Sequence, residues 1–299
     1  MGCGTSRTVE GNGKKNNGFP VCIKTIELEK LVDSMIGYDE NRIILGARDE
    51  LQILDIKSGN KTPLSTEHKG RINCVIKLTN NNIVTAGQDK TIKVWKIDQK
   101  NSLETLEGHK SMIWSINEIK GDKLISGSSD NRAIIWDLQA KKLDFELYKD
   151  KEISVVLQLK SGNVILCSKD KLMLFDLKTK KLLTTLEIKP LVWSIRELSD
   201  GTVAAGFGNG DIGILEIGSE IKTKLILKGH KKSVNCIIEL DNHKLVSSSD
   251  EKNMILWDLT DPEGKYFIEG HTDNVNTLVH ISGNKFASVS KDKTLKIWE

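Results

Sequence analysis

Short apolar runs separated by polar stretches recur along most of this 299-residue chain. Seven of these runs share one form, in which aliphatic residues lead to a bulky marker residue. They cover Leu51–Ile56, Thr91–Ile97, Ala133–Leu138, Leu172–Leu177, Asp211–Ile217, Met254–Leu259 and Leu295–Trp298. Runs of this length and composition, bounded by polar residues, are typical of β-strands.

The marker residues recur at a nearly constant interval. They are Leu54, Trp95, Trp136, Phe175, Leu215, Trp257 and Trp298, and neighbouring markers are 39 to 42 residues apart. A constant interval over most of a chain indicates an array of structural repeats, each a small unit that packs on its neighbours.

Two further landmarks keep step with the markers. A histidine stands about 27 residues before four of the tryptophans, at His68, His109, His230 and His271. An aspartate precedes most markers by five to seven residues, at Asp49, Asp89, Asp130, Asp170, Asp250 and Asp292. Because these aspartates lie in polar stretches between two apolar runs, they indicate the turns of β-hairpins.

Each repeat divides into four strands. In the third repeat the predicted strands are Ile113–Ile119, Lys123–Gly127, Arg132–Asp137 and Lys142–Leu147. A single four-stranded sheet cannot bury both of its faces, whereas seven arranged radially can. The repeat length, the Gly108-His109 pair and its counterparts, and the recurring tryptophans resemble the WD40-repeat family. This resemblance implies an all-β fold, a seven-bladed WD40 β-propeller.

The ring is predicted to close through an N-terminal outer strand. The sequence ends at Glu299, directly after the third strand of the seventh repeat, which therefore lacks its outer strand. The spare segment Val21–Glu27 is expected to pair with Leu295–Trp298 and so remove an exposed edge. The alternative is an open ring. The predicted division is a flexible N-terminal tether with an acylation motif at 1–19 and the propeller at 20–299.

The first six residues read M-G-C-G-T-S and match the N-myristoylation pattern M-G-x-x-x-[ST]. Lipidation is predicted at Gly2 by myristate and at Cys3 by palmitate, since two acyl chains anchor a protein stably where one binds only marginally. The expected location is therefore cytoplasmic, at the cytoplasmic face of a membrane. The alternative is an ordinary N-terminus that matches a short pattern by chance.

The same polar residue types recur together in four repeats. The predicted structural network consists of His68, Thr85, Asp89 and Trp95; His109, Ser126, Asp130 and Trp136; His230, Ser247 and Trp257; and His271, Ser288, Asp292 and Trp298. Ser, His and Asp could indicate a hydrolase, but an enzyme needs one such site and this set recurs at the same repeat position. The resemblance implies hydrogen bonding within each blade instead, so no catalytic residue and no enzyme activity are predicted.

The repeats differ in how complete this set is. In the sixth repeat Glu251 stands where the aspartate belongs, with Asp250 one place earlier. Repeats one, four and five have no histidine at this position. Because repeat stabilities add together with neighbour contributions, blades one, four and five are expected to be locally weaker.

Candidate partner-binding residues come from the face around the channel mouth, the usual partner surface in the family that this chain resembles. They are Arg48, Arg71, Met112, Trp114, Lys169, Leu191 and Trp193. Trp114 and Trp193 are not marker residues, and aromatic and arginine side chains are enriched at interface hot spots. The alternative is that both tryptophans only pack between blades.

Composition narrows the function further. The net charge of +3 argues against a nucleic-acid binder. Five dispersed cysteines and single histidines per repeat indicate no metal site, and no cofactor or small-molecule substrate is expected. The predicted function is a scaffold that presents the propeller to partner proteins or peptides from a membrane surface, which it contacts through its acyl chains. The alternative is a soluble adaptor subunit of a ubiquitin-ligase, RNA-processing or trafficking assembly.

Overall fold

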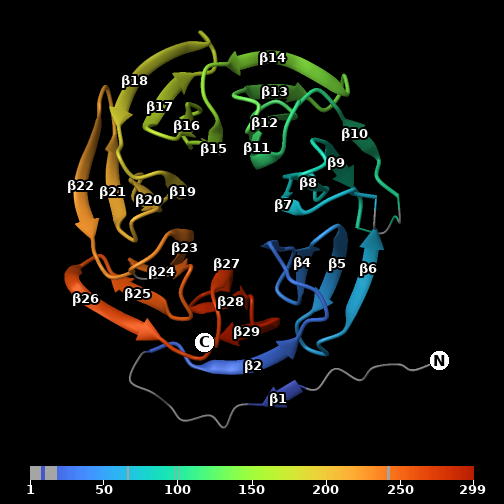
Figure 1. The fold of residues 1–299 in the computed structure, drawn as a ribbon, viewed down its shortest axis with the longest axis vertical. Coiled ribbons are helices and arrows are strands. Elements are labelled where there is room, and N and C mark those ends of the chain that lie inside the picture. The colour runs from blue at the N-terminus through green and yellow to red at the C-terminus, as the bar shows by residue number, and fades with distance from the viewer. Residues whose placement is uncertain (1–7, 11–18, 66, 98, 100, 241–242) are drawn as a thin grey trace.

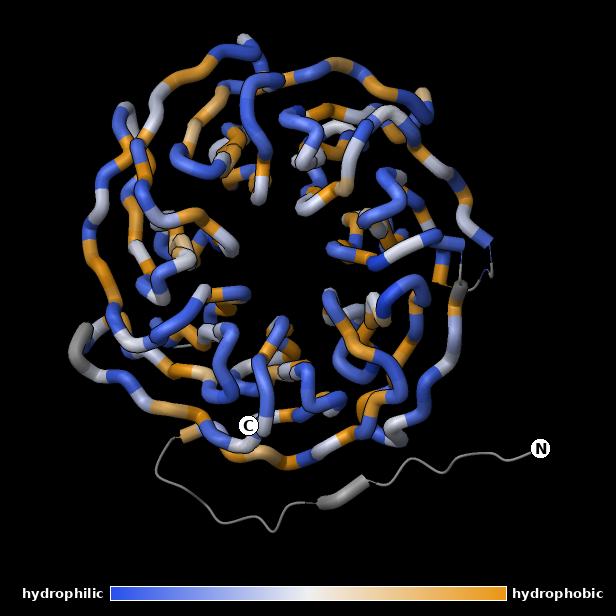
Figure 2. The backbone as a smooth tube through the Cα atoms, viewed as in Figure 1, coloured by the Kyte–Doolittle hydropathy of each residue, from blue (hydrophilic) through white to orange (hydrophobic). Residues whose placement is uncertain are grey.

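A computed structural model describes residues 8–10, 19–65, 67–97, 99, 101–240 and 243–299. Every regular element in this part of the chain is a β-strand, and the strands form seven sheets around a central channel (Figure 1). The predicted all-β, seven-bladed propeller is confirmed. Apolar residues follow the strands, while the turns that connect them are largely hydrophilic (Figure 2).

Within each blade the strands run in order from the channel to the outer rim. Blade one contains β3 (Ser34–Gly37), β4 (Arg42–Ala47), β5 (Glu50–Asp55) and β6 (Lys61–Ser65). Blade two contains β7 (Ile72–Lys77), β8 (Ile83–Gly87), β9 (Ile92–Trp95) and β10 (Glu104–Leu106). Blade three contains β11 (Ile113–Ile119), β12 (Lys123–Ser128), β13 (Ala133–Asp137) and β14 (Lys142–Tyr148), within one residue of the predicted bounds.

The remaining blades repeat this pattern. Blade four contains β15 (Ile153–Gln158), β16 (Val164–Ser168), β17 (Lys171–Asp176) and β18 (Lys181–Glu187). Blade five contains β19 (Val192–Glu197), β20 (Val203–Phe207), β21 (Ile212–Ile217) and β22 (Ile221–Leu227). Blade six contains β23 (Val234–Leu240), β24 (Lys244–Ser249), β25 (Met254–Asp258) and β26 (Asp261–Ile268). Blade seven contains β27 (Val275–Ser282), β28 (Lys285–Ser290), β29 (Thr294–Trp298) and β2 (Cys22–Glu27).

The N-terminal strand closes the ring as predicted. β2 pairs antiparallel with β29, with Cys22 opposite Trp298. Val21 and Glu299 extend the pairing, because each backbone N–H donates to the other residue's carbonyl, at 2.8 and 3.1 Å. Within the segment that was predicted as a tether, β1 (Thr8–Glu10) pairs with the outer side of β2 and adds a fifth strand to this sheet.

Hydrophobic clusters fill the boundaries between neighbouring blades. The cluster between blades seven and one, for example, packs Ile26 and Leu295 together with Ile43 and Leu54. All seven marker residues are buried. Because each blade covers a face of the next, the core is a ring of boundaries, and no blade can bury its apolar surface alone.

Polar side chains on the inner strands also connect neighbouring blades. At six of the seven boundaries a side chain donates to a backbone carbonyl in the next inner strand or just before it, at distances from 2.8 to 3.5 Å. The donors are Ser34, Asn73, Ser154, Ser194, Asn235 and Asn276. The boundary between blades three and four is built differently, and it leads to the candidate site.

Candidate functional site

The four polar sets expected from the sequence lie within their blades and are hydrogen bonded. In blade three, His109 Nδ1 lies 2.9 Å from Asp130 Oδ2 and His109 Nε2 lies 2.6 Å from Ser126 Oγ. Trp136 Nε1 donates to the same Ser126 Oγ at 2.7 Å. Blades two and seven repeat this arrangement with distances between 2.6 and 2.8 Å.

A neutral His109 allows every donor of this network to find an acceptor. Ser126 then accepts from the indole N–H and donates its own hydroxyl to His109 Nε2, and His109 Nδ1–H donates to Asp130. Burial lowers the pKa of His109, although the Asp130 carboxylate opposes that change. Burial alone would raise the pKa of Asp130, but hydrogen bonds from Arg132, Lys110 and His109 lower it to about 2.

Blade six keeps the network with a longer acid. His230 Nε2 lies 2.8 Å from Ser247 Oγ, and Trp257 Nε1 donates to that oxygen at 2.8 Å. Glu251 reaches His230 Nδ1 at 3.4 Å and accepts the Lys231 backbone N–H at 2.7 Å. Asp250 instead accepts from Asn235 on the inner strand. Glutamate, which is one methylene longer, therefore takes the place of aspartate in this network, and its contact to the histidine is longer.

Blades one and five replace the histidine, the hydroxyl residue and the tryptophan with apolar residues. In strand register, Leu45 and Ala205 occupy the position of Ser126. The sets that correspond to His109, Ser126 and Trp136 are Leu28, Leu45 and Leu54 in blade one, and Ile188, Ala205 and Leu215 in blade five, and all six are buried. In blade four Leu166 replaces the serine and Phe175 the tryptophan.

These networks do not present a nucleophile to solvent. Thr85, Ser126, Ser247 and Ser288 are completely buried, and each already accepts a tryptophan N–H. A substrate cannot reach them without opening the blade. Across the described ranges, no three His, Cys, Asp or Glu side chains group in a way that could hold a metal ion.

The candidate binding feature is a cavity at the channel mouth between blades three, four and five. It has a volume of about 120 Å³ and is lined by Trp114, Glu152, Ser154, Lys169, Leu191 and Trp193. The two indole rings meet edge to face, with centroids 6.5 Å apart and an interplanar angle of 85°. Four of the predicted partner-binding residues thus come together here.

The two tryptophans have different roles in this cavity. Trp114 is half-buried, and its Nε1 donates to Ser129 Oγ at 2.7 Å and to Glu152 Oε1 at 2.8 Å. The bond to Glu152 joins blade three to blade four. At the other six boundaries an asparagine or serine side chain makes the connection. Trp193 is 42% exposed. Its neighbour Ser194 makes the contact to the next blade, so the Trp193 side chain is not needed for that boundary.

The alternative that both tryptophans only pack between blades therefore holds in part. Trp114 does join two blades, whereas much of the Trp193 ring remains open to solvent. Gly208 lies against the Trp193 indole, since a Cβ there would stand 3.4 Å from its Nε1. A Cβ at that distance would make an ordinary van der Waals contact, so Gly208 borders the indole directly.

The other three predicted partner-binding residues lie elsewhere. Arg48 lies in the turn between β4 and β5 of blade one, and Arg71 directly precedes β7 of blade two, so neither comes from the three blades that line the cavity. Arg71 Nε lies 3.3 Å from Asp33 Oδ2. Burial raises the pKa of Asp33, and Arg71 and Arg48 partly oppose that change. Met112 is half-buried and does not line the cavity. Four of the seven predicted residues therefore line this cavity, and three do not.

Sequence reasoning did not single out Glu152, Ser129 and Ser154 as site residues. Glu152 accepts hydrogen bonds from both the Trp114 indole and the Ser129 hydroxyl. Their positions beside the channel were evident from the repeat, but nothing in the sequence indicated that the Trp114 indole would reach across a blade boundary. Gly2 and Cys3 lie outside the described residues. No helix capable of crossing a bilayer occurs in the part of the chain that the structure describes.

Comparisons with known proteins agree with this architecture. A family model described as "WD domain, G-beta repeat" matches residues 61–96, 100–137, 220–258 and 263–299. These segments end at the third strands of blades two, three, six and seven, the four blades that hold the histidine network.

Several relatives share the propeller region at low identity. The chain is 24% identical over 232 residues to a p21-activated protein kinase-interacting protein 1-like protein of Xenopus laevis, covering 75% of this chain and 63% of the relative. It is 24% identical over 241 residues to Autophagy-related protein 16 of Arabidopsis thaliana, covering 76% and 47%. Ribosome biogenesis protein YTM1 of Kluyveromyces lactis is 27% identical over 137 residues, covering 42% and 30%. The chain thus spans less than two thirds of these relatives.

Proposed function

This chain belongs to the WD40-repeat family of β-propellers, and from that premise we propose that it is a non-catalytic scaffold that holds a partner protein or peptide at the channel mouth. The Trp114–Trp193 cavity is the proposed anchor point. One relative is named as a protein kinase-interacting protein and another as a ribosome biogenesis protein. These names support the proposal that this chain has protein partners.

The exposure of Trp193 carries this proposal. An indole that is 42% exposed, beside Leu191 and a small cavity, offers apolar surface that a partner side chain could cover. Glu152 and Lys169 place one carboxylate and one ammonium at the same cavity. We therefore expect the partner to insert an apolar side chain and to place polar or charged groups around it.

The test is capture of partners by the full-length protein and by a Trp193→Ala variant. Loss of a hot-spot tryptophan weakens binding by roughly thirtyfold or more. Leu183→Ala is the matched control, because Leu183 is also exposed but lies on the outer strand β18. The proposal expects the partner set to be retained by the control and lost by Trp193→Ala. Equal capture by both variants would overturn it.

We further propose that myristate on Gly2 and palmitate on Cys3 tether this scaffold to the cytoplasmic face of a membrane. The supporting observation is the sequence M-G-C-G-T-S at the start of the chain. Fractionation of cells should find the wild type with membranes, Gly2→Ala in the soluble fraction, and Cys3→Ser divided between them. A soluble wild type would favour the adaptor alternative, in which the propeller is a subunit of a larger assembly.

A further inference from the structure

The two indole rings at the channel mouth stand nearly at right angles to each other. The Trp114 and Trp193 rings have an interplanar angle of 85°, with their centroids 6.5 Å apart, and both line the cavity of about 120 Å³. A corner between two such rings attracts a cation, because the face of an aromatic ring is the negative end of its quadrupole. The ring geometry therefore favours a positively charged group in this cavity.

A carboxylate stands beside this aromatic corner. Glu152 also lines the cavity, and its Oε1 accepts the Trp114 Nε1–H at 2.8 Å, so the carboxylate is held against one of the two rings. Ser129 donates to the same oxygen. Within the ranges that the structure describes, Glu152 forms no ion pair, and the adjacent Lys151 is bound to Asp170 at 2.6 Å. The negative charge of Glu152 is therefore available to a ligand.

The size and lining of the cavity suit a methylated ammonium group. Its volume of about 120 Å³ equals that of roughly four water molecules, and a trimethylammonium group has one nitrogen and three methyl groups. An unmethylated ammonium is strongly hydrated and has three N–H donors to satisfy. Glu152 is the one carboxylate that lines the cavity, and Leu191 adds apolar surface. Methyl groups replace the N–H donors with apolar surface that the two rings can cover.

We infer that this cavity is an aromatic cage for a methylated lysine side chain of the partner protein. The inference rests on the partner site proposed above and names the side chain that enters it. The stem and methyl groups of methyl-lysine supply the apolar surface expected there, and its nitrogen supplies a charge for Glu152 and for both rings. Trp114, held by its hydrogen bonds, is the fixed wall of the cage, and the exposed Trp193 is the wall that the ligand covers.

Lys169 is the lining residue whose charge opposes a cationic ligand. It is exposed, lies in the turn before β17, and forms no ion pair in the described part of the chain. A lysine at the edge of a cavity can keep its ammonium in water. Its charge still repels a cation and attracts an anion, so replacing Lys169 has opposite effects on the two kinds of ligand.

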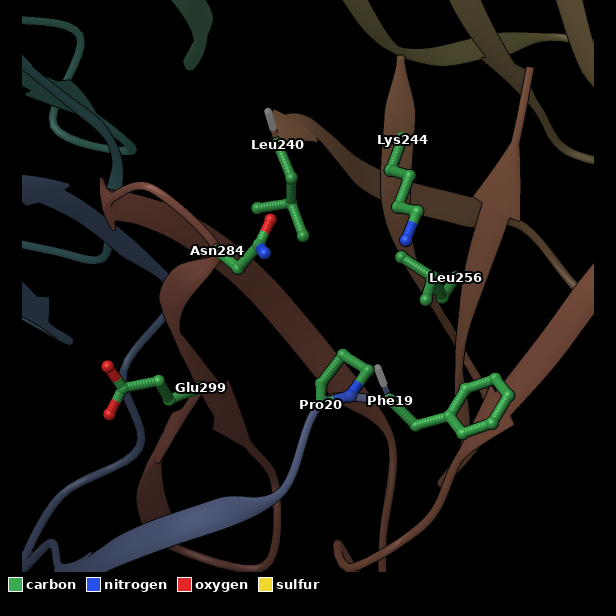
Figure 3. Close-up of a pocket in the computed structure, with 7 residues that line it drawn as sticks. All are labelled: Phe19, Pro20, Leu240, Lys244, Leu256, Asn284 and Glu299. Carbon is green, nitrogen blue, oxygen red and sulfur yellow. The ribbon is translucent and has the colours of Figure 1, made fainter. Parts of the chain in front are cut away.

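The cavity beside Phe19 shows what the second ring adds. This cavity has a volume of about 170 Å³, and Glu299 gives it a carboxylate. Phe19 is the one aromatic side chain among the described residues that line it, and in Figure 3 its ring points away from Asn284 and Glu299. Without a second ring at a right angle, it offers no aromatic corner. It therefore lacks the combination found in the Trp114–Trp193 cavity.

The test titrates the full-length protein with capped glycine peptides that carry trimethyllysine, lysine, or the neutral analogue of trimethyllysine in which carbon replaces the charged nitrogen. Binding is followed by NMR through the indole N–H signals, and Trp193→Phe identifies the signal of Trp193. Trimethyllysine should bind at least about tenfold more tightly than either other peptide, because only its side chain combines a charge with easy loss of water. It should shift the signals of Trp114 and Trp193 and leave those of the buried Trp95 and Trp298 in place.

Matched variants test the two charges in the cavity. Glu152→Gln keeps an oxygen that can accept the Trp114 N–H but removes the charge, so it should weaken trimethyllysine binding by about three- to tenfold. Lys169→Gln should strengthen binding by about two- to threefold, and weaker binding would contradict the inference. Lys222→Gln on the outer strand β22 is the charge-matched control and should leave binding unchanged. Circular dichroism and thermal unfolding confirm that each variant is folded.

The outcomes separate this inference from the partner site itself. If the neutral analogue binds as tightly as trimethyllysine, the cavity takes an apolar side chain, so the cage is wrong and the scaffold proposal stands. If no peptide shifts the Trp193 signal although partner capture still depends on Trp193, a different side chain enters the cavity and the cage is again wrong. Capture that is unaffected by Trp193→Ala overturns the partner site, and with it the methyl-lysine of a partner, even where the cavity binds trimethyllysine.

Discussion

Blades three and one fill the same positions with opposite chemistry. Blade three joins His109, Ser126 and Trp136 through hydrogen bonds, with every hydrogen used once. Blade one holds leucines at the same three positions, and these belong to the cluster that joins blades seven and one. Both arrangements are buried, and both follow the same strand register.

The difference indicates that the histidine, the hydroxyl residue and the tryptophan are kept or lost together. Removing one partner of a buried hydrogen bond leaves the other unsatisfied, whereas replacing all partners with apolar residues can be nearly neutral. Blade five follows blade one, with Ile188, Ala205 and Leu215. The expected weakness of blades one, four and five stays a prediction. It depends on whether buried leucines stabilise a blade as well as the hydrogen-bond network does.

The largest effect is expected from placing a serine in the wrong blade. Leu45→Ser puts the hydroxyl of blade three among leucines, where it finds no histidine or indole. The lost leucine volume and the unpaired hydroxyl together should lower the free energy of unfolding by about 3–5 kcal/mol, measured by urea unfolding. Leu45→Met, which nearly conserves volume, should cost less than about 1.5 kcal/mol. Equal costs for these two variants would contradict the comparison.

The second-largest effect is expected from removing the serine of the blade three network. Ser126→Ala deletes one oxygen but leaves both Trp136 Nε1 and His109 Nε2 unpaired, so about 2–4 kcal/mol of stability should be lost. Ser126→Thr is the control, because blade two already uses Thr85 at this position with contacts of 2.6 and 2.7 Å. Its cost should stay below about 1 kcal/mol.

A triple variant examines whether these residues act together. His109→Leu, Ser126→Ala and Trp136→Leu convert blade three toward the composition of blade five. The combined loss of unfolding free energy should be smaller than the sum of the three single losses, because only Asp130 remains and it keeps its bonds from Lys110 and Arg132. A strictly additive result would mean that the residues contribute independently.

Much of the fold was predictable because its signals are local and repeated. The strands of blade three and the closure by Val21–Glu27 follow from runs of apolar residues at fixed spacing. The match of the family model to only four repeats has the same origin, since those repeats keep the histidine and tryptophan. Blade one keeps the strand pattern while its distinctive residues are replaced.

The site was predictable only in part because it depends on contacts between blades. Trp114 and Trp193 stood out by residue type, but the bond from Trp114 to Glu152 joins residues that are 38 positions apart. The direction of a side chain across a blade boundary is set by packing and not by spacing. Arg48 and Arg71 share repeat positions with cavity residues, yet the ring places them on other blades.

The third effect is a difference in pH response between the two blades. Burial lowers the pKa of His109 below that of the unfolded chain, about 6.5, so the unfolded state binds more protons and stability falls as the pH drops below that value. Blade one has no such group. His109→Gln should therefore reduce the slope of unfolding free energy against pH between pH 7 and 5, by at most about 1.4 kcal/mol per pH unit. His230 and His271, whose pKa values are also lowered by burial, should maintain the remaining slope.

The smallest effect concerns the aspartate that blades three and one both keep in the turn between their second and third strands. Asp130 is nearly buried and accepts from His109 and two backbone N–H groups, while Asp49 at the corresponding position is 53% exposed and lies 3.9 Å from Lys30. Exposed ion pairs contribute little, so Asp49→Ala should change the free energy of unfolding by less than about 0.5 kcal/mol. Asp130→Ala should cost several times more because it leaves His109 without its acceptor. Comparable costs would mean that the aspartate acts through the turn alone, and that the histidine network of blade three is not what its presence stabilises.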